Sequence, residues 1–233
     1  RQMCIRDSYY AMSVWGGEQT CGIGVATANS PQGPFTDHGK MFRSNEIGVQ
    51  NSIDPSLLQY EGRNYLVWGS FRGIYVIELT ADGLSIMSGA KKKRIAGTAF
   101  EAVYIHKHGD YYYMFASIGS CCQGVKSTYK VVVGRSKKVW GPYKDKTGKP
   151  MLKNGYSLVI GANDHFVGNG HGSQIIQDDA GQDWLLYHGF SRSTPENGRI
   201  LLLDQIKWDQ EGWPYVEGGS PSYETQKAPV FNN

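Results

Sequence analysis

The chain has 233 residues, a formal net charge of +3 and a hydrophobic content of 40%. It is long enough for one large domain or two small ones. The single dense basic run, residues 91–94, is predicted to lie in a loop between strands and is not interleaved with aromatic residues, so the sequence predicts no nucleic-acid partner. No stretch approaches the roughly 18 apolar residues of a membrane span, so we expect no membrane-spanning segment in this sequence.

The composition favours strands over helices. The 30 glycines and 15 tyrosines, with only 19% charged residues, are typical of short strands and tight turns and predict an all-β protein. Residues 1–8 lack a starting methionine and do not share the periodicity that follows. We interpret them as a non-native leader and assign residues 9–233 to one β-domain.

The predicted strands form four groups of similar construction. Each group opens with a strand that carries one polar residue, passes a polar turn and continues in an aromatic-rich strand. The first and third groups both lead into a Gly-Pro-aromatic turn, at Gly33 and Gly141. Such repeats predict the blades of a β-propeller, whose first strands line a common axis. The groups cover residues 9–35, 51–79, 101–143 and 168–216.

Three polar residues open these groups. Glu101 begins an otherwise apolar strand, where a carboxyl must be hydrogen-bonded, paired or protonated. Asp54 and His171 open the second and fourth groups, so a propeller would bring all three residues to one axis. Two facing carboxyls, one protonated and one charged, are what cleavage of a glycosidic bond requires. Taken singly, each residue also fits a structural role, as a satisfied buried carboxylate, a turn aspartate or a core histidine.

The cysteines leave three alternatives open. Cys4 lies in the predicted leader, Cys121 and Cys122 are adjacent, and Cys21 stands alone. An oxidising compartment would allow a vicinal disulfide or a link from Cys21 to one of the pair, whereas buried free thiols are equally compatible. No zinc-binding spacing is present.

A set of ordered motifs across residues 9–216 resembles glycoside hydrolase family 43, and in particular its arabinanase-like members. The motifs are Ser52-Ile53-Asp54-Pro55, Gly69-Ser70-Phe71, Phe100-Glu101-Ala102, the run 111–124 with its Ser-Cys-Cys, Val133-Gly134-Arg135-Ser136 with Gly141-Pro142-Tyr143, and Gly170-His171.

The resemblance implies a five-bladed β-propeller and an inverting mechanism on α-L-arabinofuranosides or β-xylosides. Glu101 matches the general acid, and Asp54 matches the aspartate that tunes the pKa of this acid and orients it. His171 matches the central histidine that helps to hold a calcium or other ion together with waters. We assign Asn51, Ser70 and Phe71, which lie beside the matched aspartate and strand end, to the sugar site.

Two departures from the family pattern affect this interpretation. The general base of the family is an aspartate on the first strand of the first blade, and no matching segment is present, so we expect only blades two to five. Asp7 lies in the predicted leader and is not assigned as the base. Gly172 follows His171 where arabinanase-like members usually carry asparagine.

The sequence therefore predicts an arabinanase or α-L-arabinofuranosidase that acts on arabinan, with this fragment inactive for lack of the base. Alternatives are a catalytically inactive propeller that binds glycans and a β-xylosidase of the same family. We expect a monomer without an organic cofactor. A polymeric substrate implies a secreted, periplasmic or cell-surface location, although no signal peptide is visible.

Overall fold

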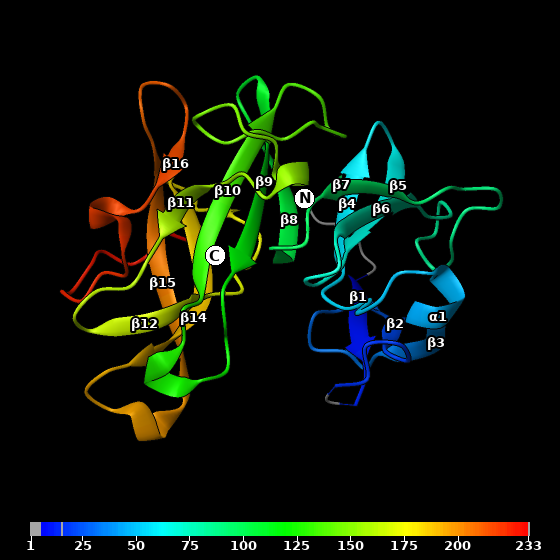
Figure 1. Cartoon of the computed structure of the whole chain (residues 1–233), viewed down its shortest axis with the longest axis horizontal. Coiled ribbons are helices and arrows are strands. Elements are labelled where there is room, and N and C mark those ends of the chain that lie inside the picture. Colours follow the sequence, from blue (N-terminus) through cyan, green and yellow to red (C-terminus); the bar gives the residue numbers. More distant parts are fainter. Residues whose placement is uncertain (1–5, 15, 233) are drawn as a thin grey trace. The chain divides into compact units, whose positions relative to one another are not determined.

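The computed structural model describes residues 6–14 and 16–232 (Figure 1). These residues form sixteen strands, one four-residue helix and four 3-10 helices, and the predicted all-β class is confirmed. None of the helices in these two ranges is long and apolar enough to cross a lipid bilayer. The chain divides into two compact units, Arg1–Val103 and Tyr104–Asn233.

The first unit contains two antiparallel sheets, each a meander whose strands follow one another in chain order. The short helix α1 (Ser44–Ile47) lies between the two sheets in the sequence. The strands are β1 (Arg6–Met12), β2 (Gly22–Ala28) and β3 (Thr36–Arg43) in one sheet, and β4 (Ser56–Tyr60), β5 (Arg63–Trp68), β6 (Ile74–Glu78) and β7 (Lys93–Ala96) in the other.

Two boundaries in this unit differ from the expected ones. Strand β1 begins at Arg6, which pairs with Ala28, so residues 6–8 of the predicted leader belong to the sheet. Residues 1–5 of that leader lie outside the described part of the chain. The predicted basic loop ends in a strand, because Lys93 and Arg94 begin β7 and keep their side chains exposed.

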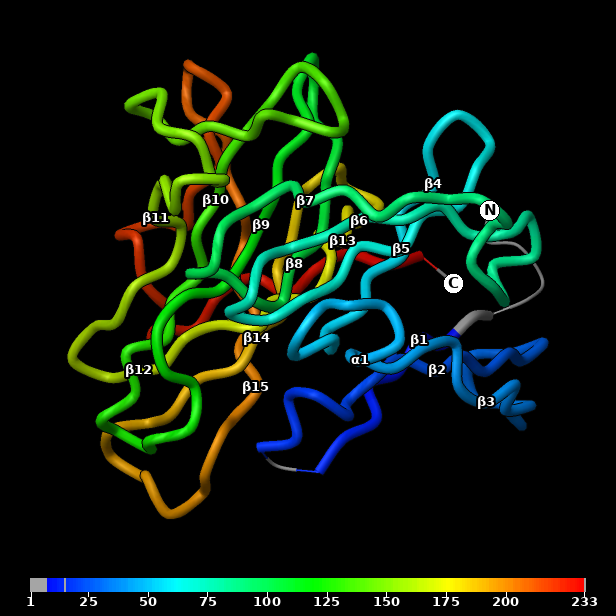
Figure 2. The backbone as a smooth tube through the Cα atoms, turned by 45° about the vertical axis from the view of Figure 1, so that its right-hand side comes forward, coloured from blue at the N-terminus to red at the C-terminus, as the bar shows by residue number. Residues whose placement is uncertain are grey.

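The second unit contains two further antiparallel sheets, coloured from green to red in Figure 2. One is a meander, and the other has the order β12-β14-β15-β16, with β13 also paired to β14. The meander has the order β11-β10-β9-β8, and the unit boundary falls within β8, whose residues 101–103 belong to the first unit. Its strands are β8 (Glu101–His108), β9 (Tyr111–Ile118), β10 (Lys130–Ser136) and β11 (Ser157–Ile160), and those of the other sheet are β12 (Phe166–Gly170), β13 (Ile176–Gln177), β14 (Asp183–Ser191), β15 (Arg199–Trp208) and β16 (Pro214–Tyr215). The 3-10 helices are η1 (Gly124–Lys126), η2 (Met151–Lys153), η3 (Pro195–Asn197) and η4 (Glu217–Gly219).

Each unit has its own apolar core, built from the aromatic-rich strands that the sequence predicts. In the first unit, Trp68 is completely buried and its ring lies 5.3 Å from that of Phe42. In the second unit, Phe115 is completely buried and stacks on Tyr104 with ring centroids 5.1 Å apart. Burial of these side chains stabilises the sheets by roughly 1.5–3 kcal/mol per large residue.

The two Gly-Pro-aromatic turns have the same construction, as expected for a repeat. Gly33 and Gly141 have φ angles of 82° and 76°, values that favour glycine. A Cβ atom on Gly33 would lie 3.1 Å from the backbone nitrogen of Phe35, and one on Gly141 would lie 2.8 Å from that of Tyr143. The turn therefore recurs with the same steric requirement in both units.

Candidate active site

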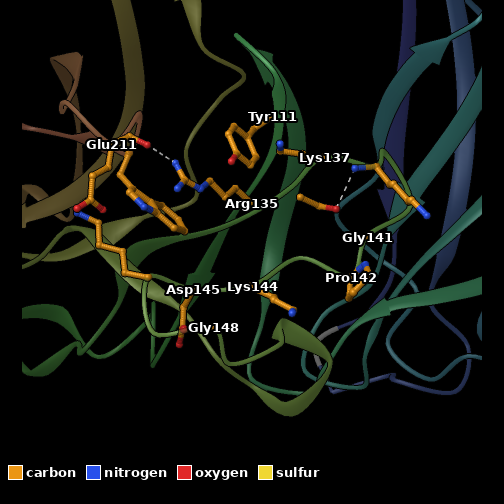
Figure 3. A pocket seen from close by; sticks show the side chains of 13 residues that line it. Tyr111, Arg135, Lys137, Gly141, Pro142, Lys144, Asp145, Gly148 and Glu211 are labelled. Carbon is orange, nitrogen blue, oxygen red and sulfur yellow. Dashed lines mark hydrogen bonds between the residues drawn. The ribbon is translucent and has the colours of Figure 1, made fainter.

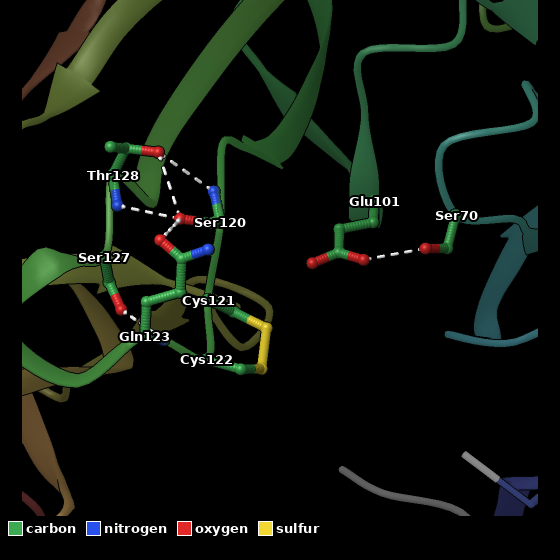
Figure 4. Close-up of a disulfide and its surroundings, with 8 residues drawn as sticks. All are labelled: Ser70, Glu101, Ser120, Cys121, Cys122, Gln123, Ser127 and Thr128. Carbon is green, nitrogen blue, oxygen red and sulfur yellow. Dashed lines mark hydrogen bonds between the residues drawn. A yellow bond between two sulfur atoms is a disulfide. The ribbon is translucent and has the colours of Figure 1, made fainter. Parts of the chain in front are cut away.

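Glu101 is the first residue of β8 and is only 7% exposed. Its Oε2 atom accepts a hydrogen bond of 2.7 Å from the hydroxyl of Ser70, which is 1% exposed (Figure 4). The expectation that a carboxyl in this position must be hydrogen-bonded is met by this contact. A buried hydroxyl that holds one carboxyl oxygen also fixes the plane of the carboxyl group.

The position of Ser70 depends on a close approach of two backbone segments. Gly69 has a φ of 125°, and a Cβ atom there would lie 2.3 Å from the carbonyl oxygen of Gly73. The amide of Gly69 donates a hydrogen bond of 3.0 Å to the carbonyl of Ile53. Glycine is therefore required immediately before the serine that contacts the candidate acid.

Asn51 and Phe71, the other two residues assigned to the sugar site, belong to the same hydrogen-bonded network. The Asn51 side-chain amide donates to the carbonyl oxygen of Ser70 at 3.1 Å. The Phe71 amide donates to the carbonyl oxygen of Phe100 at 2.9 Å, directly before Glu101. Asn51 therefore contacts the serine that bonds to the candidate acid, and Phe71 contacts the residue before that acid.

Asp54 reaches the candidate acid through the backbone. It lies two residues before β4, and its Oδ2 atom accepts a hydrogen bond of 3.0 Å from the amide of Ala102. Because Ala102 directly follows Glu101, this hydrogen bond to Asp54 fixes the peptide group that joins Glu101 to Ala102. The structure therefore links Asp54 to the backbone directly after Glu101.

Left-handed backbone conformations mark these positions. Among the described residues, seven non-glycine residues have a positive φ, and five of them lie at or next to predicted site residues. Each such conformation costs on the order of 1–3 kcal/mol and persists only where the surroundings impose it, which is typical of functional sites. The five are Asn51 (53°), Asp54 (56°), Phe71 (51°), Ala102 (50°) and His171 (52°).

His171 belongs to the second unit and directly follows β12. Its amide donates a hydrogen bond of 2.8 Å to the hydroxyl of Ser117, and its exposed imidazole lies 6.2 Å, centroid to centroid, from the ring of His188. Burial, Arg199 and His171 together lower the pKa of His188 to about 4, so this imidazole is neutral at neutral pH.

The sequence interpretation did not include His188. Its Nδ1 atom is buried without a hydrogen-bond partner in the described part of the chain. A prediction of which strands pair would have identified this histidine. His188 lies opposite Gly170 in the ladder between β12 and β14. The residue next to Gly170 is His171, so the pairing alone brings the two imidazoles close together.

His171 is the residue predicted to help hold a calcium or other ion. Calcium takes six to eight oxygen ligands. In the two described ranges, no group of three His, Cys, Asp or Glu side chains with converging ligand atoms includes His171. The described side chains of these four types therefore supply no three-ligand group at His171, and an ion held together with waters stays a prediction.

The alternatives for the cysteines are resolved for three of the four. Cys121 and Cys122 form a vicinal disulfide in the loop after β9 (Figure 4). Cys21 is a buried free thiol whose Sγ lies 3.1 Å from the hydroxyl oxygen of Ser44. Cys4 lies outside the described residues.

A cavity of about 490 Å³ in the second unit contains none of the predicted site residues (Figure 3). Its lining is basic, and the Arg135 guanidinium lies 4.3 Å from the ring of Tyr111 and 4.2 Å from that of Trp213. The arginine therefore occupies one face of each of these two rings.

A profile of the glycosyl hydrolases family 43 matches residues 5–214. The chain belongs to this family. The family 43 chain is 38% identical over 231 residues to the extracellular exo-alpha-(1->5)-L-arabinofuranosidase ArbA of Cellvibrio japonicus, covering 90% of this chain and 65% of that protein. It is 36% identical over 214 residues to the extracellular endo-alpha-(1->5)-L-arabinanase 1 of Bacillus subtilis, covering 88% of this chain and 63% of that protein. The chain thus spans somewhat less than two thirds of the length of these two relatives.

Solved structures give the same result for the fold. The family 43 chain superposes on the α-L-arabinanase of Cellvibrio cellulosa in complex with arabinohexaose with a TM-score of 0.84 and 33% identity, covering 94% of this chain and 76% of that one. An exo-1,5-α-L-arabinanase from a bovine ruminal metagenomic library matches with a TM-score of 0.82 and 35% identity, covering 93% and 75%. The four sheets are therefore blades of the β-propeller fold, and the predicted resemblance is confirmed. That the complete propeller has five blades stays a prediction.

Proposed function

We propose that this family 43 protein hydrolyses arabinan by an inverting mechanism with Glu101 as the general acid. The observation that carries the proposal is the network in which a buried carboxyl is held at one oxygen by Ser70 and at the following peptide by Asp54. The similarity to an arabinofuranosidase and an arabinanase supports arabinan as the substrate.

The network provides the positioning that this mechanism needs. In an inverting glycosidase, one carboxylic acid protonates the leaving oxygen while a second carboxylate, roughly 6.5–9.5 Å away, activates water on the opposite face of the sugar. Ser70 fixes the plane of the Glu101 carboxyl and Asp54 fixes the peptide that follows, so the proton is delivered from a set direction. We place Asn51 and Phe71 in the adjoining sugar site. The general base stays a prediction, in a segment before residue 9.

The test compares Glu101→Gln with the unmodified sequence in the hydrolysis of linear arabinan. Both are expressed as the present chain and as a longer chain that includes the upstream coding sequence. The amide keeps the shape and can still accept the Ser70 hydrogen bond but cannot supply the proton, so we expect the longer chain to lose roughly 10²–10⁴-fold in kcat. The matched control is Glu61→Gln, in the exposed turn between β4 and β5. Unchanged activity in Glu101→Gln would refute the proposed acid.

The same experiment separates the alternative functions. Binding of arabino-oligosaccharides without release of sugar, by both chain lengths, would favour a glycan-binding propeller. Release of xylose from xylo-oligosaccharides, with no reaction on arabinan, would favour a β-xylosidase.

We further propose that the protein is secreted and works as a monomer. Both relatives named above are described as extracellular, and a disulfide such as that of Cys121 and Cys122 persists in an oxidising compartment. Detection of the protein in the culture medium, with both cysteines resistant to alkylation before reduction, would be the expected result.

A further inference from the structure

A second group of ligand-type side chains lies in the second unit, at positions that the proposed reaction does not use. His106 and His108 are two residues apart on β8 and therefore project to the same face of the strand. Asp183, the first residue of β14, meets them from the neighbouring sheet. One ligand atom from each of these three residues lies within 4.8 Å of the other two. We call this group the histidine–aspartate cluster.

The carboxylate of this cluster is buried without a cationic side chain. Asp183 is 7% exposed, and in the described part of the chain its only partner at ion-pair distance is His108, with 3.9 Å between Nδ1 and Oδ2. That separation is too long for a hydrogen bond. A buried carboxylate is costly unless a positive charge compensates it. The gap between the carboxylate and the imidazoles is therefore a favourable place for a cation.

Neutral donors already orient the carboxylate. The indole Nε1 of Trp208 donates to Oδ2 at 2.8 Å, and the side-chain amide of Gln177 donates to Oδ1 at 3.2 Å. Hydrogen bonds of this kind commonly fix carboxylate ligands of metal ions. They add no positive charge, so the need for a cation remains.

The same tryptophan also positions a histidine. The His108 ring stacks on the indole of Trp208 with centroids 3.7 Å apart and planes inclined by 8°. The His106 ring lies 6.0 Å from that indole, inclined by 19°. Trp208 thus holds the aspartate by a hydrogen bond and His108 by stacking, which limits the freedom of two of the three ligand groups.

We propose that His106, His108 and Asp183 bind one divalent transition-metal ion, with Zn²⁺ as the best fit. Two imidazoles and one carboxylate, completed by water, form a common tetrahedral zinc environment. Ligand atoms around a tetrahedral zinc ion are about 3.3 Å apart, so the side chains must close by roughly 1.5 Å at most. The His108 side chain is 40% exposed, which gives the ion access and the ring room to move. The bound ion would connect β8 with β14 and so link the two sheets of the second unit.

The test is a titration of the whole, chelator-treated chain with ZnCl₂ by calorimetry, repeated with Co²⁺ and followed by visible absorption. We expect one ion per chain and a d–d absorption band typical of tetrahedral cobalt. At a Zn²⁺ concentration about 100 times Kd, the unfolding midpoint should rise by roughly 5–10 °C. His106→Gln and Asp183→Asn should each weaken binding at least about 10-fold and abolish the rise.

Two control variants address other histidines. His165 stacks on Tyr223 at 3.6 Å and lies outside the cluster, so His165→Gln should bind Zn²⁺ like the unmodified chain. His171→Gln tests the separately predicted central ion and should also leave the stoichiometry at one. If Asp183→Asn fails to fold, His108→Phe keeps a ring on Trp208 and removes a ligand. No binding at 1 mM Zn²⁺, or unchanged binding in the folded cluster variants, would overturn the proposal.

Discussion

Ala102 in the first unit and His171 in the second share a backbone arrangement but present different chemistry. Both are non-glycine residues in the left-handed region, with φ angles of 50° and 52°. In both, the amide is held by a side chain from an earlier part of the chain, Asp54 in one case and Ser117 in the other. The residue before Ala102 is Glu101, whereas the residue before His171 is Gly170.

The packing around the preceding residue accounts for this difference. A Cβ atom on Gly170 would lie 2.3 Å from the ring of Tyr129, so no side chain fits there. At the corresponding position in the first unit, the buried carboxyl of Glu101 accepts a hydrogen bond from the hydroxyl of Ser70. The repeat thus fixes a backbone conformation, and the neighbouring side chains decide which chemical group each copy presents.

Among the tests of this comparison, substitution of Asp54 should have the largest effect, a loss of kcat. Asp54→Ala removes the acceptor for the Ala102 amide and should lower kcat of the longer chain roughly 100-fold, because the candidate acid loses its position. Asp54→Asn keeps an oxygen in place and should lower kcat only about 10-fold or less. Kinetics on arabinan measure both values, with Asp82→Asn in an exposed turn as the control. Equal losses in the two Asp54 variants would show that the charge, and not the hydrogen bond, matters.

Ser117→Ala tests the corresponding contact in the second unit. Ser117 is 1% exposed, and its loss leaves the His171 amide without this acceptor. We expect the free energy of unfolding, measured in urea, to fall by about 1–3 kcal/mol. Ser13→Ala, which removes an exposed hydroxyl, should change it by less than about 0.5 kcal/mol. A similar small change in Ser117→Ala would mean that the contact does not support the left-handed backbone.

The pH dependence of stability should reveal the contribution of His188, whose ring lies beside that of His171. Because the pKa of His188 falls from 6.5 to about 4 on folding, the unfolded chain binds this proton more readily. Stability should therefore be complete above pH 6.5 and decline as the pH falls towards 4. Partial exposure limits the contribution to about 1 kcal/mol. Urea denaturation of His188→Gln across this range should show a flatter acid limb, and a profile parallel to that of the unmodified chain would contradict the expectation.

The smallest expected effect is on stability, when the left-handed backbone at Ala102 is relieved of its side chain. Ala102→Gly relieves the steric cost of a positive φ and should stabilise the fold by roughly 0.5–1 kcal/mol. Ala81→Gly, in an exposed turn where φ is not positive, should have the opposite sign. Thermal unfolding of both variants measures the difference. Destabilisation by Ala102→Gly would show that the methyl group contributes more by packing than it costs in backbone strain.

Much of the fold follows from patterns that a sequence displays directly. Groups in which a polar turn leads into an aromatic-rich strand predict the sheets, and the repeated turns at Gly33 and Gly141 indicate that the sheets are copies of one unit. The burial of Glu101 was also predictable, since this residue heads an apolar strand, where a carboxyl must be hydrogen-bonded, paired or protonated.

The details of the site were less predictable because they depend on backbone conformation. The residue type of Ala102 does not signal a positive φ, which is found mostly in glycine and, among the other residues, in asparagine, aspartate and histidine. The three residues Asp54, Glu101 and His171 therefore appear equivalent in the sequence. In the structure, it is Ala102, and not Glu101, that shares the left-handed conformation of Asp54 and His171. The histidine–aspartate cluster was missed because its members come from strands that are far apart in the chain.

The vicinal disulfide has a consequence for how the loop after β9 keeps its shape. A cross-link stabilises a fold by reducing the chain entropy of the unfolded state, and the gain grows with the number of residues enclosed. Cys121 and Cys122 enclose none, so their bond can restrict the unfolded chain very little. The loop is instead closed by Ser120 and Thr128, whose backbone and hydroxyl groups bond to each other at 3.0–3.3 Å. Reduction should therefore leave the global unfolding transition nearly unchanged, and the two sulfur atoms act as a local rigid element of the loop.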